Sequence, residues 1–320
     1  MERNAPTDRR SRLRGVIGIA SAGRPTVLTQ TVRDLQSQGA PALEIIVCVP
    51  GAEHAGDLLQ HSHLLVIYGP NGLTRQRNAI LEAARGRADV LVFFDDDFVP
   101  HRDYVNNILT AFEDRPNLVI ATGTVVADGI LGHPIERAAA LARLSSCEAP
   151  AQRATPCHNA YGCNMAVRIE TARASDIWFD ESLPLYGWLE DVDFSRAMAR
   201  HGDCMRLSDA IGIHLGVRSG RQPGRRLGYS QVANPWFMMR KKTLTGPRGL
   251  IQITRNLLAN IVGCAVKQAH IDRAGRLHGN MLAFADLISG RLDPRRILTL
   301  DQKVTTWPAA KPTTTEGPRG

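Results

Sequence analysis

Long hydrophobic runs are scarce in this sequence of 320 residues, although 43% of its residues are hydrophobic. The longest candidate, residues 250–266, is interrupted by Gln252, Arg255, Asn256 and Asn260. Because a spanning helix needs about 20 largely apolar residues, we expect no membrane span. The arginine-rich residues 1–14 are followed by no long apolar stretch, so we expect no signal peptide either.

Paired cysteine spacings are also missing. The chain has six cysteines and no CxxC motif: Cys48, Cys147, Cys157, Cys163, Cys204 and Cys264. Zinc sites and disulfide scaffolds use close, regular cysteine spacings, which this pattern lacks. We therefore expect free thiols in a reducing compartment, which is typical of a cytoplasmic protein.

Acidic residues are outnumbered, with 31 Asp and Glu against 39 Lys and Arg, for a formal net charge of +8. The excess favours anionic partners: phosphorylated small molecules, acidic lipid surfaces or nucleic acid. Charge alone does not distinguish between these partners. The length allows one large or two moderate domains, and the composition is that of a globular protein.

Short apolar runs alternate with helical patterns in the first third of the chain. The apolar runs cover residues 15–20, 43–49, 64–68 and 90–94. Amphipathic helices are expected from Pro25 to Gly39 and over residues 73–85. This alternation predicts right-handed βαβ units, and therefore an α/β fold with a mostly parallel sheet between helices.

The pattern changes in the rest of the chain. We expect strands near 118–126 and 161–167 and a helix near 190–201, and the chain beyond Gly220 becomes basic and helical. The resulting division has four parts: a basic extension (1–14), an α/β domain (15–220), a basic helical region (221–304) and a disordered tail (305–320).

The strongest chemical signal is FFDDDFVP, residues 93–100. Three adjacent carboxylates at a strand end repel one another, so a cation is expected there, and oxygen ligands suit Mg²⁺ or Mn²⁺. In an extended segment Asp95 and Asp97 point to one side and Asp96 to the other. The alternative interpretation is a solvated acidic turn.

A second acidic motif is GWLEDVDF, residues 187–194, at the start of a predicted helix. A helix N-terminus favours ionised carboxylates, and an ionised carboxylate can act as a base. Glu190 and Asp191 are the candidates. The alternative is that the acidic residues, Asp193 included, only cap the helix.

Basic and aromatic residues complete the candidate site. Arg75 and Arg77 begin a predicted helix where they suit a diphosphate, although a solvated basic turn is an equal alternative. His214 follows an apolar run and is a candidate metal ligand or diphosphate contact. Three aromatic residues near the second acidic motif can stack on a sugar or fill the core: Trp178, Tyr186 and Trp188.

Taken in order, four segments resemble the inverting GT-A glycosyltransferases of family 2, which transfer sugars from nucleotide diphosphate donors. They are IGIASAGRP (17–25), RQRNAIL (75–81), FFDDD (93–97) and WLEDVDF (188–194), within a resemblance that spans about residues 15–215. The resemblance implies a GT-A, Rossmann-like sandwich with a mostly parallel central sheet, here followed by a C-terminal helical region.

The same resemblance implies roles for individual residues. Asp95 contacts the ribose or the metal, Asp97 ligates the metal, and Asp191 is the general base on the acceptor hydroxyl. The residues placed at the donor are Ala20, Ser21, Arg24 and Arg77, to which we add Asp96, and His214 is added as a third metal ligand. Where such enzymes commonly carry an acidic residue after the second strand, this chain has VCVPG, residues 47–51, so the nucleotide base stays open.

The sequence therefore predicts an inverting, hexosyl-type glycosyltransferase that depends on Mg²⁺ or Mn²⁺ and uses a nucleotide-diphosphate sugar. We expect a glycan or lipid-linked acceptor, a role in polysaccharide or glycoconjugate synthesis, and no nucleic acid partner. The expected location is the cytoplasm, with peripheral contact at an anionic inner membrane face.

Two other functions are weighed against this hypothesis. A nucleotidyltransferase also needs carboxylates and a metal, but it carries a glycine-rich basic loop after the first strand, where SAGRP has one glycine. A non-catalytic basic module for anionic lipid or nucleic acid is the other alternative, and it predicts strong salt sensitivity.

Overall fold

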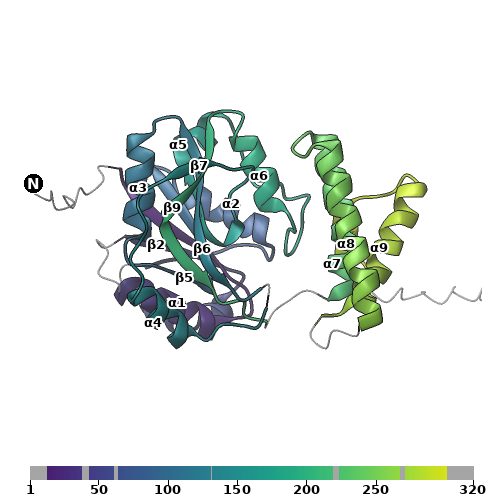
Figure 1. The fold of residues 1–320 in the computed structure, drawn as a ribbon, viewed down its shortest axis with the longest axis horizontal. Coiled ribbons are helices and arrows are strands. Elements are labelled where there is room, and N and C mark those ends of the chain that lie inside the picture. The colour runs from purple at the N-terminus through teal and green to yellow at the C-terminus, as the bar shows by residue number, and fades with distance from the viewer. Residues whose placement is uncertain are drawn as a thin grey trace, which may run out of the picture.

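The computed structural model describes residues 13–37, 43–60, 64–130, 132–218, 223–266 and 271–300. Within these ranges an α/β unit extends to residue 218 and three long helices follow from Gly224 (Figure 1). The predicted tail and residues 1–12 of the basic extension lie outside the described residues.

One half of the sheet is parallel, as the alternating pattern predicts. Its strands lie in the order β3-β2-β1-β4, and each pairs in parallel with its neighbours. The elements of this half are β1 (Gly15–Ala20), α1 (Pro25–Ser37), β2 (Glu44–Val49), the short helices η1 (Ala52–His54) and η2 (Gly56–Gln60), β3 (Leu64–Tyr68), α2 (Leu73–Ala84) and β4 (Val90–Asp95).

The other half of the sheet is mixed. Strand β8 runs antiparallel between β4 and β6, whereas β6 and β9 are parallel and β5 pairs with β9 at the edge. The elements are β5 (Phe98–Pro100), α3 (Tyr104–Asp114), β6 (Leu118–Asp128), α4 (Arg137–Ser145), β7 (Ala154–Pro156), η3 (Gly162–Asn164), β8 (Met165–Arg168), α5 (Ile169–Ala174), α6 (Glu190–Met198) and β9 (Asp203–His214). The strand expected over 161–167 begins only at Met165, because residues 162–164 form a short 3₁₀ turn.

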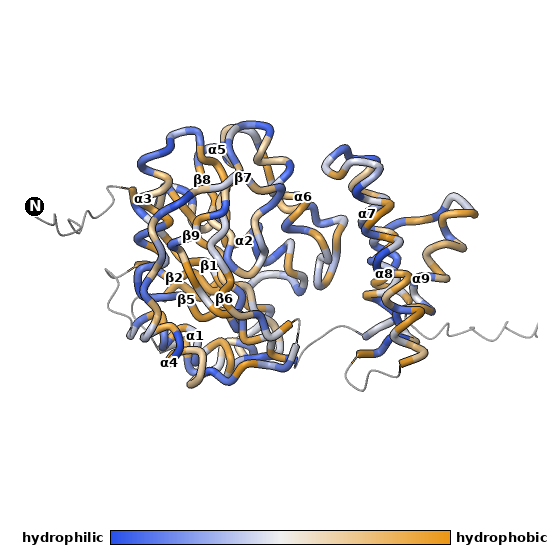
Figure 2. The backbone as a smooth tube through the Cα atoms, in the orientation of Figure 1, coloured by the Kyte–Doolittle hydropathy of each residue, from blue (hydrophilic) through white to orange (hydrophobic). Residues whose placement is uncertain are grey.

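The hydrophobic core lies on both faces of this sheet. Alternate residues of a strand point to opposite faces, so Ile17 of β1 belongs to one core cluster with Leu28 of α1, while Val16 belongs to the other with Ile80 of α2. Gly18 allows α2 to approach closely, because a Cβ there would lie 2.6 Å from Ile80 Cγ2. Figure 2 shows these strands as hydrophobic segments inside the unit.

The C-terminal region consists of α7 (Gly224–Lys241), α8 (Gly246–Val266), α9 (Arg273–Ile288) and the short helix η4 (Pro294–Leu298). Its helical character is as expected. The polar residues within 250–266 do not break α8, which is long and apolar enough to cross a membrane by length and composition, and only 22% of its most apolar window is buried. The expectation of no membrane span is left untested, because length and composition alone do not show that α8 crosses a bilayer.

Candidate active site

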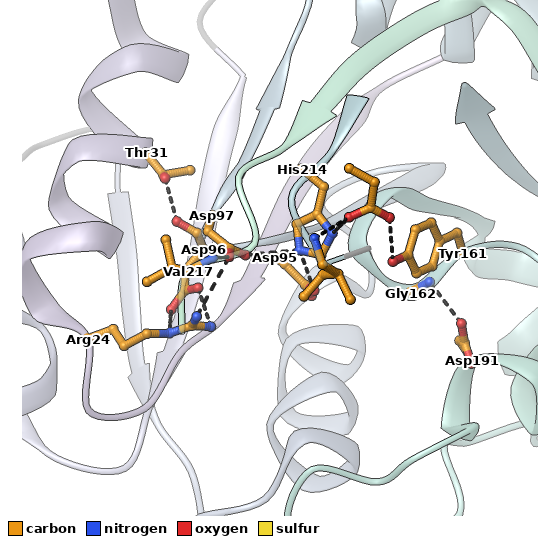
Figure 3. A network of polar contacts seen from close by, with 12 residues as sticks. Arg24, Thr31, Asp95, Asp96, Asp97, Tyr161, Gly162, Asp191, His214 and Val217 are labelled. Carbon is orange, nitrogen blue, oxygen red and sulfur yellow. Dashed lines mark hydrogen bonds and ion pairs between the residues drawn. The ribbon is translucent and has the colours of Figure 1, made fainter. Parts of the chain in front are cut away.

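The topology brings the motifs to one end of the sheet. The central parallel strands β1 and β4 end side by side, so the loop after Ala20 meets the acidic run that begins at Asp95. Strand β9 delivers His214 to the same place through its pairing with β5, where His214 lies opposite Phe98. The start of α6 approaches from the other side, with Asp191 near Gly162 (Figure 3).

Asp95, Asp97 and His214 form a compact cluster, called the metal-type cluster below. Each offers one ligand atom, and these atoms all lie within 4.8 Å of one another. His214 Nε2 is 3.2 Å from Asp97 Oδ1 and 3.9 Å from Asp95 Oδ2. The two aspartates lie on the same side, as the alternation of an extended segment predicts, and they come together with a histidine from 117 residues further along the chain.

Asp96 points the other way and is fully buried. Its carboxylate accepts a hydrogen bond from Ser21 Oγ at 2.5 Å and lies 2.5 Å from the Arg24 guanidinium. Burial raises the pKa of Asp96 to about 7, although the charge of Arg24 acts in the opposite direction. The structure thus places Asp96 beneath the loop after β1, where it holds Ser21 and Arg24, rather than in the open part of the site.

His214 has a second acidic partner that sequence reasoning missed. Asp128, at the end of β6, places Oδ1 3.2 Å from His214 Nδ1, and Tyr161 donates its hydroxyl hydrogen to Asp128 Oδ2 at 3.1 Å. Burial alone lowers the pKa of His214, but the contacts with Asp128 and Asp97 raise it to about 10. The only signal for Asp128 was its place at the carboxyl end of a predicted strand.

This cluster fits a divalent metal. Two carboxylates and one imidazole make an oxygen and nitrogen donor set that suits Mn²⁺, and Mg²⁺ also takes carboxylates. In metal sites the imidazole is usually fixed by a hydrogen bond from its other nitrogen to a carboxylate. Asp128 stands in that position relative to His214, so the residues present match what such an ion requires.

Arg77 connects the metal-type cluster to the second acidic motif. Its side chain is 2% exposed, and its guanidinium lies 2.6 Å from Glu190 Oε1 and 3.2 Å from Asp95 Oδ1. It also donates to the Gly162 carbonyl at 2.7 Å. These contacts hold the Arg77 guanidinium between Asp95 and Glu190. Arg75, expected at the same edge, instead lies 3.3 Å from Glu181 at the half-exposed surface.

Asp191 and Glu190 lie beside this arginine. Asp191 Oδ2 accepts the Gly162 N–H at 3.0 Å and Oδ1 accepts the Val192 N–H at 2.8 Å. Burial is the largest influence on both carboxyls and raises their pKa values. The helix start favours the ionised form of Asp191, as expected from the sequence, and desolvation acts in the opposite direction. Asp193 faces away and pairs with Lys241 at 2.6 Å.

The turn before α6 is held in an unusual backbone conformation. Leu189 has a φ of 70°, a left-handed conformation that side chains with a Cβ rarely adopt. Asn234 of α7 donates to the Trp188 carbonyl at 2.7 Å, which supports this turn from the C-terminal region. Strained backbone of this kind persists only where its surroundings hold it, and it is found often at functional sites.

The three candidate aromatic residues have different surroundings. Tyr186 is 55% exposed in the turn before α6, so it remains a candidate for sugar stacking. Trp178 lies instead against the Arg85 guanidinium, 4.5 Å from the ring centre, and donates to Asp176 at 2.7 Å. Trp188 is partly buried, and its carbonyl accepts the Asn234 hydrogen bond.

Comparison with known families gives one clear match. Residues 17–173 match the family model described as Glycosyl transferase family 2. Among curated proteins, the chain is 27% identical over 126 residues to the glucosyl-dolichyl phosphate glucuronosyltransferase of Haloferax volcanii. That match covers 37% of this chain and 40% of the relative, so it spans less than half of the relative's length.

Solved structures share the fold. The mannosyltransferase PcManGT from Pyrobaculum calidifontis, in complex with GDP-Man and Mn²⁺, superposes with a TM-score of 0.51 at 13% identity over 92% of this chain and 89% of that chain. GalNAc-T7 with UDP, GalNAc and Mn²⁺ gives 0.52 at 13% identity over 72% of this chain and 51% of that chain. The α/β unit therefore has the GT-A fold that the sequence predicts.

Proposed function

We propose that the chain transfers a sugar from a nucleotide-diphosphate donor to an acceptor hydroxyl with inversion, on the premise that residues 17–173, which match the family 2 glycosyltransferase model, form a domain of that family. One observation carries the proposal. Arg77 is fully buried and contacts both Asp95 and Glu190, so the cluster suited to a metal and the carboxylate pair suited to acid–base chemistry are built as one unit.

The donor side consists of the loop after β1 and the metal-type cluster. Asp95, Asp97 and His214 would hold Mg²⁺ or Mn²⁺, which when bound neutralises charge on the leaving diphosphate. Asp128 Oδ1 lies 3.2 Å from His214 Nδ1, and this contact favours the ring orientation in which Nε2 faces Asp97.

In the proposal the loop after β1 borders the nucleotide, and Asp96 supports this loop. Ala20, Ser21 and Arg24 border the nucleotide, and Arg24 lies 3.8 Å from Asp97. Asp96 does not contact the donor directly. It fixes the side chains of Ser21 and Arg24 from below.

On the acceptor side, Asp191 is the proposed general base. The N–H groups of Gly162 and Val192 fix its two oxygens, which leaves the carboxylate oriented to accept a proton from the acceptor hydroxyl as that oxygen attacks the sugar. A pKa raised by burial makes the carboxylate a stronger base. Glu190 is a positioning residue, because its carboxylate pairs with the Arg77 guanidinium. Direct displacement with the base opposite the leaving group inverts the anomeric carbon.

The acceptor and the location are the least constrained parts of the proposal. The curated relative is named for action on a glucosyl-dolichyl phosphate, which supports a lipid-linked acceptor over a free glycan. We propose a hexosyl-type transfer in polysaccharide or glycoconjugate synthesis, at the cytoplasmic side of a membrane. Nucleic acid has no part in it.

A donor panel tests the proposal. UDP-, GDP- and dTDP-sugars are incubated with the full chain, with Mn²⁺ or with a chelator, and release of nucleoside diphosphate is measured with and without crude lipid-linked or glycan acceptors. We expect release from one donor class, with inversion in the product, and loss of release with the chelator. Pyrophosphate formation from a nucleoside triphosphate and a sugar phosphate would indicate a nucleotidyltransferase instead, and no turnover of any donor would leave only a binding module.

A further inference from the structure

The helix α8 buries few residues, most of them small or polar, and turns most of its large apolar residues outward. Its buried positions are Gly249, Ile253, Asn260 and Gly263. The exposed positions include Leu250 and Ile251 at 57%, Leu258 at 55%, Ile261 at 47%, Val262 at 59% and Val266 at 67% exposed. A surface helix of a water-soluble protein shows the opposite arrangement, with its apolar stripe facing the core.

The exposed face is continuously apolar in the second half of the helix. Leu258 and Val262 are one turn apart and lie near the centre of the outward side, opposite Asn260 and Gly263. From Leu258 to the end of the described helix at Val266, every exposed residue is apolar. Contiguous exposed apolar surface of this kind marks a contact with a protein or a membrane.

Polar contacts and close backbone approach add to the small apolar cluster that holds the helical region together. Asn260 donates to Gln231 Oε1 of α7 and to Asn280 Oδ1 of α9, each at 2.8 Å, and Asn280 donates to the Gly228 carbonyl at 2.7 Å. A Cβ on Gly279 would lie only 2.1 Å from the Arg225 carbonyl oxygen, so α7 and α9 approach closely at their glycines. Small residues and interhelical hydrogen bonds are what hold helices together in lipid.

The net charge of the helical region indicates which partner contacts the apolar face of α8. The described residues from 223 to 300 include twelve Lys and Arg and three Asp, so their net charge of +9 exceeds the +8 of the whole chain. Arg248 and Arg255 lie exposed on α8 itself. An apolar face bordered by arginines matches the headgroup region of an anionic membrane.

We propose that α8 docks in the plane of an anionic membrane, with its face of Ile251, Leu258, Ile261 and Val262 in the lipid. The orientation follows from its other side, which packs on α7, and α7 is tied to the α/β unit through Lys241, 2.7 Å from Asp180. With one side packed on α7 and α9, α8 presents only its opposite side to lipid, as a helix lying in the membrane plane does. This docking deepens the proposed function, since it brings the active-site domain to a surface where lipid-linked acceptors reside.

Vesicle flotation tests the docking without donor or acceptor. The full chain is mixed with vesicles of phosphatidylcholine containing phosphatidylglycerol, or of phosphatidylcholine alone, at low and high salt. We expect the parent to float with the anionic vesicles. The double variant Leu258→Gln/Val262→Gln should lose most of this binding, and Arg248→Gln/Arg255→Gln should lose the part that depends on phosphatidylglycerol. Tyr68→Gln, which changes a residue 57% exposed on the α/β unit, is the matched control and should float as the parent does.

The outcomes are separable from those for sugar transfer. A parent that stays with the soluble fraction, or a Leu258→Gln/Val262→Gln variant that floats as well as the parent, overturns the docking while leaving donor turnover untouched. A parent that forms a dimer split by the same double variant, with no flotation, shows that a second copy covers the face. Thermal unfolding of each variant checks that it is folded, which is expected because both substituted positions are exposed.

Discussion

The α/β unit and the C-terminal helices differ in where they place their apolar and polar side chains. In the α/β unit the core is apolar on both faces of the sheet, and buried charges gather mainly at the candidate active site, where Arg77 pairs with Glu190. In the helical region a buried asparagine network lies beside a small apolar cluster that includes Ile253, and most of the large apolar side chains of α8 face outward. The first arrangement suits a domain surrounded by water, and the second suits a helix with lipid on one side.

The two regions meet at the helix that carries the proposed base. Asp193 of α6, two residues after Asp191, lies 2.6 Å from Lys241 and accepts from Thr243 at 2.5 Å. The turn before α6 is held by Asn234 of α7. The C-terminal region therefore supports the candidate active site, because it contacts the turn before α6 and the helix that carries Asp191.

The largest effect is expected at the metal-type cluster. Asp97→Asn removes a negative ligand but keeps an oxygen that can accept the Val217 N–H, which Asp97 now accepts at 2.7 Å. We expect loss of Mn²⁺-dependent donor turnover with the fold retained, measured by nucleoside diphosphate release and thermal unfolding. Glu170→Gln, an exposed carboxylate on α5, is the control and should turn over donor as the parent does.

The next effect concerns the base. Asp191→Asn keeps the shape and an acceptor oxygen but removes the basic carboxylate, so transfer at saturating donor should fall by about 10²- to 10⁴-fold. Donor affinity should stay near the parental value, which separates lost chemistry from lost binding. Transfer at the parental rate would remove Asp191 as the base, and Glu190 would be the next candidate.

The pH profile of transfer sharpens the same assignment. Asp191 must be deprotonated to act, and burial raises its pKa. The rate at saturating donor and Mn²⁺ should therefore fall as the pH drops through a value above the ordinary aspartate pKa of about 3.9. The other charged groups nearby are Arg77, which lowers this pKa, and Asp95, which raises it. An acid limb at or below the ordinary value contradicts the assignment.

A smaller effect is expected where the two regions join. Lys241→Met leaves the buried Asp193 without its cation, and because Lys241 itself is 32% exposed the cost is expected to stay below the roughly 3 kcal/mol of a fully buried pair. Thermal unfolding should shift downward, and transfer should fall because α6 loses a support next to the base. Lys242→Met removes the same charge from the exposed neighbouring position and is the control. Equal stability of the two variants would show that the two regions are not coupled at this point.

The sequence predicted those parts of the fold that depend on local patterns. The strands ending at Ala20, Val49 and Tyr68 follow from short apolar runs, and the common direction of Asp95 and Asp97 follows from strand alternation. What it missed depends on contacts between distant segments. Asp128 reaches His214 only because β6 pairs with β9.

The same limit applies to Arg24 and to α8. Nothing near Arg24 in the sequence shows that Asp96 will be its partner, since the loop after β1 must first meet the end of β4. Nor does the order of residues 246–266 say which side of α8 is covered, because that depends on where α7 and α9 lie. Tertiary packing determines both the partner of Arg24 and the covered side of α8.

The most direct test of the active-site assignment is calorimetry of a nucleoside diphosphate, UDP and GDP in turn, binding to the parent, Asp97→Asn and Asp191→Asn, with and without Mn²⁺. We expect the parent and Asp191→Asn to bind one of these nucleotides equally well and only with Mn²⁺, and Asp97→Asn to lose that Mn²⁺-dependent binding. Equal Mn²⁺-dependent binding by the parent and Asp97→Asn would contradict the account, because the donor would then be anchored elsewhere in the molecule.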